Sequence, residues 1–190
     1  EMCPADTYKE QIGTAACDTC FINSGTDSAP GTVNLTSCLC APGYYGSITN
    51  ASSTCTMCPS GKFKVAYGSS GCVECGASSS TAINPGVAPD SPEVCLCDPG
   101  FEAAAVVEGE PVECEQCAAN TYKAQLSMSI PCQDCPANSN TNLELGSVSA
   151  AQCLCDPGYQ GSSACTACPP STYKSESGAS TCVWCPIFSS

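Results

Sequence analysis

Closely spaced cysteine pairs are the residues of this chain best suited to chemistry. The motif C-x-x-C occurs seven times, beginning at Cys17, Cys55, Cys72, Cys114, Cys132, Cys165 and Cys182. Such a pair can be a redox dithiol, half of a zinc site or part of a disulfide framework. A thioredoxin-like dithiol normally occurs once, after a strand in a βαβ unit, whereas this motif recurs through turn-rich sequence. The interposed C-x-C motifs fit a zinc ribbon poorly, so we predict structural disulfides, with no metal site and no cofactor.

Other residues that enzymes use are missing or scattered. The chain has no histidine, which excludes Ser-His-Asp and Cys-His arrangements. Its carboxylates are spread along predicted loops, with nothing to tune two of them as an acid and a base. We therefore predict that the chain is not an enzyme and has no catalytic residues.

The charge of the chain restricts its partners. Five lysines and no arginine stand against 18 acidic residues, for a net charge of −13. Nucleic acids and anionic membrane surfaces need basic clusters, so we predict neither as a partner. No stretch approaches the roughly 20 apolar residues that span a bilayer, so we predict no membrane insertion in this segment. The first residues do not form a signal peptide, and a leader of a secreted protein would have been removed or would lie outside this chain.

The cysteine content indicates the compartment. The chain has 21 cysteines in 190 residues but only 6% aromatic residues, so cross-links must replace much of a conventional core. So many cysteines serve as bridges only in an oxidising environment, which predicts an extracellular location, either secreted or at the cell surface.

The cysteines fall into three sixfold repeats and a partial fourth. Repeat 1 (residues 1–56) holds Cys3, Cys17, Cys20, Cys38, Cys40 and Cys55; repeat 2 (57–115) holds Cys58, Cys72, Cys75, Cys95, Cys97 and Cys114; repeat 3 (116–166) holds Cys117, Cys132, Cys135, Cys153, Cys155 and Cys165; repeat 4 (167–190) holds Cys168, Cys182 and Cys185. We expect the odd total to reflect a truncated repeat rather than a stray reactive thiol.

An aromatic–lysine pair follows the first cysteine of every repeat. The four pairs are Tyr8-Lys9, Phe63-Lys64, Tyr122-Lys123 and Tyr173-Lys174. One interpretation is an aromatic ring packed on a disulfide beside a lysine whose ammonium reaches into water. The other is a cationic stripe that meets the acidic side of a neighbouring repeat or chain.

The spacers between repeats are short, and turn residues dominate the rest of the chain. Only two residues join successive repeats, at Thr56-Met57, Glu115-Gln116 and Thr166-Ala167. Three peptide steps span at most about 11 Å, so we predict little freedom at each joint and an elongated, semi-rigid rod. We expect short β-hairpins around the disulfides, with mostly turns and loops between them. Pro157-Gly158 predicts a type II turn, with Tyr159 packed beside the bridges.

The repeat resembles known cysteine-rich modules. The ending C-x-C-x-P-G-[YF] is similar to the second half of an EGF-like module. The whole repeat, such as CPSGKFKVAYGSSGCVEC followed by CLCDPGFEA in repeat 2, resembles the cysteine-rich repeat of ephrin receptors. This resemblance covers essentially the whole chain and implies a small disulfide-rich fold of tandem EGF-like modules. It carries little information about function, since such modules serve in receptors, matrix proteins and surface proteins.

The EGF-like order implies a disulfide pairing that spacing alone leaves open among 15 possibilities per repeat. The implied bridges are Cys3–Cys20, Cys17–Cys38, Cys40–Cys55, Cys58–Cys75, Cys72–Cys95, Cys97–Cys114, Cys117–Cys135, Cys132–Cys153, Cys155–Cys165 and Cys168–Cys185, with Cys182 unpaired. A first-to-second bridge, as in tumour necrosis factor receptor-like modules, would contradict this order. Each bridge should contribute roughly 3 kcal/mol by closing a loop of about 15 residues. Calcium-binding EGF modules carry an acidic signature before the first cysteine, which is absent here, so the resemblance implies no calcium site.

Glycosylation and two loop features complete the candidate sites. Asn34-Leu-Thr and Asn50-Ala-Ser are N-glycosylation sequons, and we predict covalent glycans on both. The only tryptophan, Trp184, is expected to pack against a bridge or against chain that completes repeat 4. The longer Phe101–Glu113 loop of repeat 2 is a candidate contact surface, or simply a local hairpin.

Two functions fit these features. The first is an extracellular structural glycoprotein segment, a disulfide-stapled rod in a stalk, matrix element or surface filament that associates with itself or with other extracellular proteins. The alternative is a receptor or adhesion ectodomain that binds a protein ligand through its loops, marked by an exposed apolar patch or by one deviant repeat.

Overall fold

The computed structural model describes residues 2–82, 87–105, 112–162 and 164–186. Contacts divide the chain into two compact units, Glu1–Leu96 with Val106–Val112, and Cys97–Ala105 with Glu113–Ser190. The division therefore falls inside repeat 2, between its fourth and fifth cysteines, and not at a two-residue spacer. The second half of repeat 2 thus groups with repeats 3 and 4.

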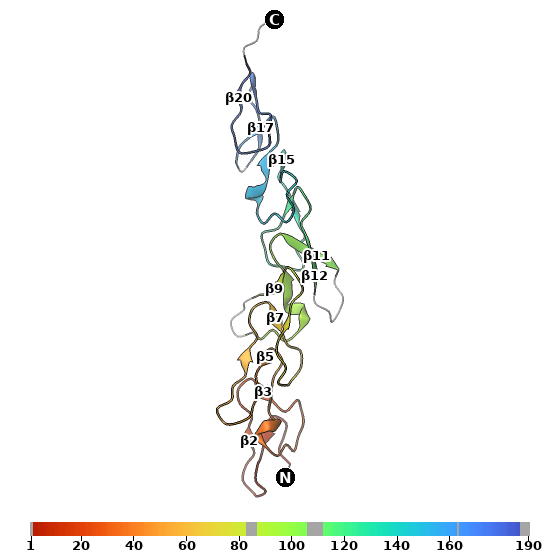
Figure 1. The fold of residues 1–190 in the computed structure, drawn as a ribbon, viewed down its shortest axis with the longest axis vertical. Helices are drawn as coiled ribbons and strands as arrows, with labels where there is room; N and C mark the ends of the chain where they lie inside the picture. The colour runs from red at the N-terminus through yellow and green to blue at the C-terminus, as the bar shows by residue number, and fades with distance from the viewer. Residues whose placement is uncertain (1, 83–86, 106–111, 163, 187–190) are drawn as a thin grey trace. The chain divides into compact units, whose positions relative to one another are not determined.

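Two-stranded antiparallel hairpins of three kinds recur through the described residues (Figure 1). The first kind follows the first cysteine of a repeat: β1 (Thr7–Tyr8) with β2 (Asp18–Thr19), β7 (Lys62–Phe63) with β8 (Val73–Glu74), β13 (Thr121–Tyr122) with β14 (Gln133–Asp134), and β19 (Thr172–Tyr173) with β20 (Val183–Trp184). The second kind includes the C-x-C motif: β3 (Ser24–Gly25) with β4 (Leu39–Cys40), β9 (Ser79–Thr81) with β10 (Cys95–Cys97), and β15 (Ser139–Asn140) with β16 (Leu154–Cys155).

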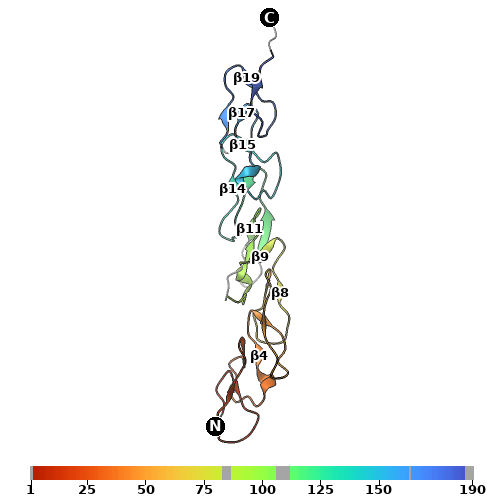
Figure 2. The ribbon, with the colours of Figure 1, turned by 90° about the vertical axis from the view of Figure 1, so that its left-hand side faces the viewer.

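The third kind of hairpin contains the spacers between repeats. Its members are β5 (Tyr44–Tyr45) with β6 (Thr56–Met57), β11 (Phe101–Ala105) with β12 (Glu113–Gln116), and β17 (Tyr159–Gln160) with β18 (Thr166–Ala167). A single 3-10 turn precedes each fourth cysteine: η1 (Leu35–Ser37), η2 (Pro92–Val94) and η3 (Ala150–Gln152). A second view shows the same short strands between long loops (Figure 2). The predicted fold class, a small disulfide-rich fold of tandem modules with short hairpins, is confirmed.

Ten disulfides join the first cysteine of each repeat to the second and, in repeats 1 to 3, the third to the fourth and the fifth to the sixth. They are Cys3–Cys17, Cys20–Cys38, Cys40–Cys55, Cys58–Cys72, Cys75–Cys95, Cys97–Cys114, Cys117–Cys132, Cys135–Cys153, Cys155–Cys165 and Cys168–Cys182. Their Cα–Cα distances of 5.4 to 5.8 Å are typical of disulfides. Cys185 is free and exposed.

The EGF-like order is therefore wrong for the first four cysteines of repeats 1 to 3 and for the cysteines of repeat 4. The predicted pairs that the structure contradicts are Cys3–Cys20, Cys17–Cys38, Cys58–Cys75, Cys72–Cys95, Cys117–Cys135, Cys132–Cys153 and Cys168–Cys185. The prediction that Cys182 is unpaired is wrong as well, because Cys185 is the free residue. The fifth-to-sixth bridges are common to both orders, and the structure contains all three.

Repeat 1 shows why the first cysteine pairs with the second. The turn at Pro4–Thr7 reverses the chain, with the Thr7 N–H donating to the Pro4 carbonyl at 3.3 Å. Cys3 thereby returns beside Gly31, whose N–H donates to the Cys3 carbonyl at 2.8 Å. The neighbouring residue, Thr32, accepts from the Lys9 N–H. Cys3 and Lys9 therefore lie at the same end of the hairpin β1–β2.

The second and third cysteines lie at opposite ends of that hairpin. Tyr8 is opposite Asp18, so Cys17 follows at the end where Lys9 and Cys3 lie. Cys20 is at the other end, where its N–H donates to the Asp6 carbonyl at 3.0 Å. Strand residues rise about 3.3 Å each, so the three steps from Cys17 to Cys20 place them roughly 10 Å apart. Only Cys17 can therefore reach Cys3.

Cystine dominates the buried residues. Of the buried hydrophobic side chains among the described residues, only Ile48, Phe63 and Val112 are not cysteine. One cluster combines Cys38, Cys40, Ile48 and Cys55, and Tyr44 packs against it. This composition agrees with the prediction that cross-links replace a conventional core.

Candidate functional site: the joints between repeats

Each joint between repeats is a paired strand and not an open linker. The second spacer residue lies opposite the aromatic residue that follows Pro-Gly: Met57 opposite Tyr44, Gln116 opposite Phe101, and Ala167 opposite Tyr159. The sixth cysteine, the spacer and the Pro-Gly turn are thus held together by one small hairpin at every joint.

The Pro-Gly turn exposes its glycine to the next repeat. Gly158 has a φ of +81°, and the Tyr159 N–H donates to the Asp156 carbonyl at 3.0 Å. Because proline fixes a negative φ at the preceding position, the turn is type II, as predicted. The equivalent glycines have similar values: Gly43, +78°, and Gly100, +82°.

Both backbone groups of that glycine bind the following repeat. The Gly100 N–H donates to the Lys123 carbonyl at 2.8 Å, and the Gly100 carbonyl accepts from the Cys117 N–H at 2.8 Å. Gly43 makes the same pair of bonds with Lys64 and Cys58, as does Gly158 with Lys174 and Cys168. The backbone of the aromatic–lysine motif is therefore part of each joint.

The lysine side chain completes the joint. The Lys64 ammonium donates to the carbonyls of Cys40, Tyr44 and Gly68 at 3.0, 2.8 and 2.8 Å. Lys123 bonds in the same way to Cys97, Phe101 and Ser127, and Lys174 to Cys155, Tyr159 and Gly178. In each case, two carbonyls belong to the preceding repeat and one lies four residues after the lysine. We call this arrangement the lysine clamp.

The clamp buries a positive charge that makes no ion pair with a carboxylate of the described residues. Only 1% of Lys123 is exposed, and Lys64 and Lys174 are also buried. Three carbonyls satisfy the three donors of each ammonium. Desolvation lowers the pKa of Lys64 and of Lys123, and the charges of Glu102 and Asp98 partly offset it by raising the pKa of Lys123. The clamp thus depends on geometry that replaces the water around a buried cation.

Neither interpretation of the aromatic–lysine pairs describes these three lysines. Their ammonium groups do not reach into water, because the preceding repeat covers them. They do meet a neighbouring repeat, but its backbone carbonyls are the hydrogen-bond acceptors instead of acidic side chains. The constant place of the lysine in the sequence was a usable signal, whereas nothing in the sequence identified its acceptors.

Two joints contain a further side-chain contact between repeats. Glu102 accepts a hydrogen bond from the Cys132 N–H at 2.9 Å, and Gln160 accepts one from the Cys182 N–H at 2.8 Å. Tyr45 is the corresponding residue at the first joint. The residue two places after the turn glycine therefore adds a second attachment at the two joints where its side chain carries an amide or carboxylate oxygen.

Both predicted glycosylation residues lie on exposed segments of repeat 1. Asn34 precedes η1, and the hydroxyl of Thr36, the third sequon residue, donates to the Asn34 Oδ1 at 2.6 Å. Asn50 is exposed, and its Oδ1 accepts from the Ser52 N–H at 2.9 Å. They belong to different loops of the repeat, Asn34 between β3 and β4 and Asn50 between β5 and β6.

Two predicted loop features have different outcomes. Trp184 lies in β20 with 77% of its surface exposed, so the prediction that it packs against a bridge is wrong for the described chain. The Phe101–Glu113 loop begins with β11 and ends at β12, which pair as a hairpin with an irregularity between Ala103 and Ala105. Residues 106–111 of this candidate contact surface lie outside the described residues.

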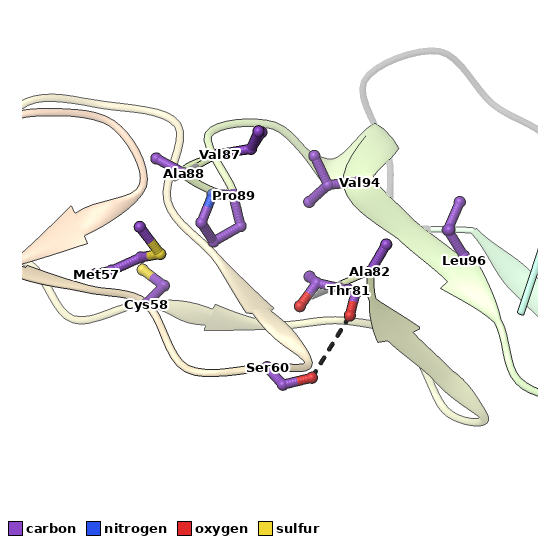
Figure 3. A pocket seen from close by; sticks show the side chains of 10 residues that line it. All are labelled: Met57, Cys58, Ser60, Thr81, Ala82, Val87, Ala88, Pro89, Val94 and Leu96. Carbon is purple, nitrogen blue, oxygen red and sulfur yellow. Dashed lines mark hydrogen bonds between the residues drawn. The ribbon is translucent and has the colours of Figure 1, made fainter. Parts of the chain in front are cut away.

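A hollow of about 260 Å³ lies in the first compact unit (Figure 3). Its lining residues are Met57, Cys58, Ser60, Thr81, Ala82, Val87, Ala88, Pro89, Val94 and Leu96. The Ser60 hydroxyl bonds to the Thr81 carbonyl at 3.5 Å. None of these lining residues has an ionisable side chain apart from Cys58, which is bridged. The lining is mostly apolar, and its polar side-chain groups are the hydroxyls of Ser60 and Thr81.

The described residues contain no cluster of three or more cysteine, histidine, aspartate or glutamate side chains that would suit a metal ion. In the same residues, no helix has the length and the apolar character needed to cross a membrane.

Comparison with known proteins points to one kind of repeat. A family described as tyrosine-protein kinase ephrin type A/B receptor-like matches residues 106–153 and 158–190. Cysteine repeat modular protein A of Toxoplasma gondii is 38% identical over 95 residues, which are 48% of this chain and 3% of that protein. Human ephrin type-B receptor 4 is 46% identical over 65 residues, 34% of this chain and 6% of the receptor.

A third relative contains EGF-like domains by its name. It is the signal peptide, CUB and EGF-like domain-containing protein 2 of Danio rerio, 30% identical over 83 residues, which are 42% of this chain and 8% of that protein. The chain therefore spans less than a tenth of the length of each of these relatives. Together with the recurring disulfides, the matches support a cysteine-rich repeat family for this chain, and its second half is similar to ephrin-receptor-like repeats.

Proposed function

We propose that this chain is a structural segment of an extracellular glycoprotein: a disulfide-stapled rod in a stalk, matrix element or surface filament. The observation that carries this proposal is the lysine clamp, which joins successive repeats at Lys64, Lys123 and Lys174. A two-residue spacer, a hairpin and a buried cation leave a joint few ways to bend. Ten disulfides require an oxidising compartment, which supports the extracellular location.

Stiff joints predict a measurable shape in solution. Small-angle X-ray scattering of the chain should give the profile of one extended, semi-rigid particle. A double variant, Lys64→Ser with Lys123→Ser, should broaden the distribution of dimensions, because the carbonyl acceptors of both clamps lose their donor. A compact wild-type particle would contradict the rod. So would a wild-type distribution of dimensions as broad as that of the double variant.

Glycans on Asn34 and Asn50 form part of the proposal. Both side chains are exposed, and the two sequons lie in the segments that connect the strands of the hairpins β3–β4 and β5–β6. Together with the chain's net charge of −13, such glycans would keep the surface hydrated. Enzymatic removal of N-glycans, followed by peptide mass spectrometry, should convert both residues to aspartate in protein from its native source.

A second candidate function is a receptor or adhesion ectodomain. It is favoured by three exposed apolar residues in one loop of repeat 3: Leu143, Leu145 and Val148. Clusters of this kind often mark protein contacts. A Leu143→Ser and Leu145→Ser variant should leave the scattering profile unchanged and abolish binding to a native partner if this function holds. Association of copies of the wild-type chain that persists in this variant would favour the structural role.

A further inference from the structure

Lys9 has the sequence position of a clamp lysine but only part of a clamp. Its ammonium donates to the carbonyl of Gly13, four residues later, which is the same contact that Lys64 makes with Gly68. Its other bond goes to the Ala15 carbonyl of its own loop at 2.7 Å. Lys9 therefore has one clamp acceptor, and lacks the two that a preceding repeat supplies to the other three lysines.

The backbone around Lys9 already has the geometry of a joint. The Lys9 N–H donates to the Thr32 carbonyl, as the Lys64 N–H does to Pro89 and the Lys123 N–H does to Ser147. Tyr8 pairs with Thr32 in a parallel bridge, just as Tyr122 pairs with Ser147. The face of repeat 1 is thus built in the same way as the faces that receive a Pro-Gly turn in repeats 2 and 3.

This face has a hollow and exposed apolar side chains. The hollow measures about 460 Å³, and its lining includes Met2, Lys9, Ile12, Gly31 and Val33. Met2, Ile12 and Val33 are all exposed. In repeats 2 and 3, the Pro-Gly turn of the preceding repeat covers the corresponding face closely. Gly43 lies against Ala88, and Gly100 lies against Gly146, and neither glycine has room for a Cβ.

We propose that the Lys9 face binds the second half of a six-cysteine repeat, a C-x-C-x-P-G-aromatic segment closed by its own disulfide. The carbonyls of the fifth cysteine and of the aromatic residue would accept hydrogen bonds from the Lys9 ammonium. They would supply the two clamp acceptors that Lys9 lacks in this chain. The turn glycine would bond to the Lys9 carbonyl and to the Cys3 N–H. Recognition therefore uses backbone groups and one lysine, so that segments with different side chains fit the same face.

A second copy of this chain does not offer a suitable segment. The three C-x-C-x-P-G-aromatic segments of the described chain already bind Lys64, Lys123 and Lys174. Their carbonyls and glycines are therefore occupied. This interaction is separate from the proposed structural role, because it concerns how repeats recognise one another, whatever the whole chain does.

The test is lysine acylation followed by peptide mass spectrometry. In the unaltered chain, Lys9 and Lys62 should react quickly, while the clamp lysines should be protected because acylation then requires local opening. A copy of residues 39–57 is then fused directly before Cys3 in place of Glu1 and Met2. The fused chain should form one additional disulfide, and its Lys9 should react at least about tenfold more slowly, with Lys62 unchanged.

Two further measurements make the outcome decisive. The same fusion with Gly43→Val in the added copy should form the additional disulfide and leave Lys9 reactive, since a side chain would block the joint. The unfused chain should show the same Lys9 reactivity at every protein concentration. The proposal is overturned if Lys9 of the fusion stays as reactive as Lys62 although the bridge has formed, or if a rising concentration of the unfused chain protects Lys9.

Discussion

The ammonium group of Lys123 donates a hydrogen bond to the backbone carbonyl of Phe101 at 2.6 Å, although the two residues belong to successive repeats. They are 22 positions apart and lie on either side of a two-residue spacer. This bond, with its equivalents at Lys64 and Lys174, makes the second half of one repeat and the first loop of the next a single structural element.

Removing the Lys123 ammonium should loosen one joint. Lys123→Met keeps the apolar stem of the side chain but leaves the carbonyls of Cys97, Phe101 and Ser127 without this donor. We expect a local loss of about 3 kcal/mol, measured as faster native-state hydrogen exchange of the Gly100 N–H. Lys62→Met is the matched control, since Lys62 makes an exposed ion pair with Glu74, and it should hardly change that exchange. Equal effects of the two variants would argue against the clamp.

Two turn glycines allow a sterically matched comparison. Gly100 and Gly158 both have a φ near +80°, but a Cβ on Gly100 would lie 2.4 Å from the Gly146 carbonyl oxygen, whereas one on Gly158 would meet nothing within 4 Å. Gly158→Ala should cost about 1 kcal/mol from backbone strain alone. Gly100→Ala should cost about 2 kcal/mol more, because the joint must also move. Denaturant unfolding under non-reducing conditions measures both, and similar losses would show that the contact at Gly100 is unimportant.

The disulfide order can be checked without reduction. Alkylation of the intact protein should modify one cysteine, Cys185. Proteolysis should then release linked peptides that contain Cys168 with Cys182 and Cys3 with Cys17. Alkylation at Cys182, with Cys168 linked to Cys185, would contradict this pairing and support the EGF-like order.

The buried lysines predict a dependence on alkaline pH. Burial lowers the pKa of Lys64 and Lys123 in the folded chain below the ordinary value of 10.5, which the unfolded chain keeps. Between the lowered and ordinary values the unfolded state binds more protons, so these lysines make the free energy of unfolding rise with pH in that window. Below the window both states are charged, and burial of the charge lowers stability by a constant amount.

An NMR titration of the lysine Nζ groups tests this directly. A Cys185→Ser variant prevents thiol exchange at high pH and leaves the clamps intact. Both Nζ signals should titrate below pH 10.5. Titration at or above 10.5 would mean that the three carbonyl acceptors favour the charged form more than desolvation disfavours it.

Local patterns were the most informative part of the sequence. The sixfold cysteine repeat, the two-residue spacers and the Pro-Gly turns are all short-range features, and the hairpins and turns that they predict are present, as at Pro157-Gly158. The exposure of Trp184 was missed because the sequence does not say which neighbours cover a residue.

By itself, the sequence determined that this is a disulfide-rich chain of tandem repeats with short hairpins, because composition and spacing act locally. Tertiary structure decided which cysteines meet and where the lysines go. Cys17 reaches Cys3 only because the Pro4–Thr7 turn returns Cys3 to that end of the hairpin. Lys64 is buried only because backbone carbonyls of the preceding repeat converge on it. Every residue has a backbone carbonyl, so no pattern of side chains could reveal which of them form a binding site.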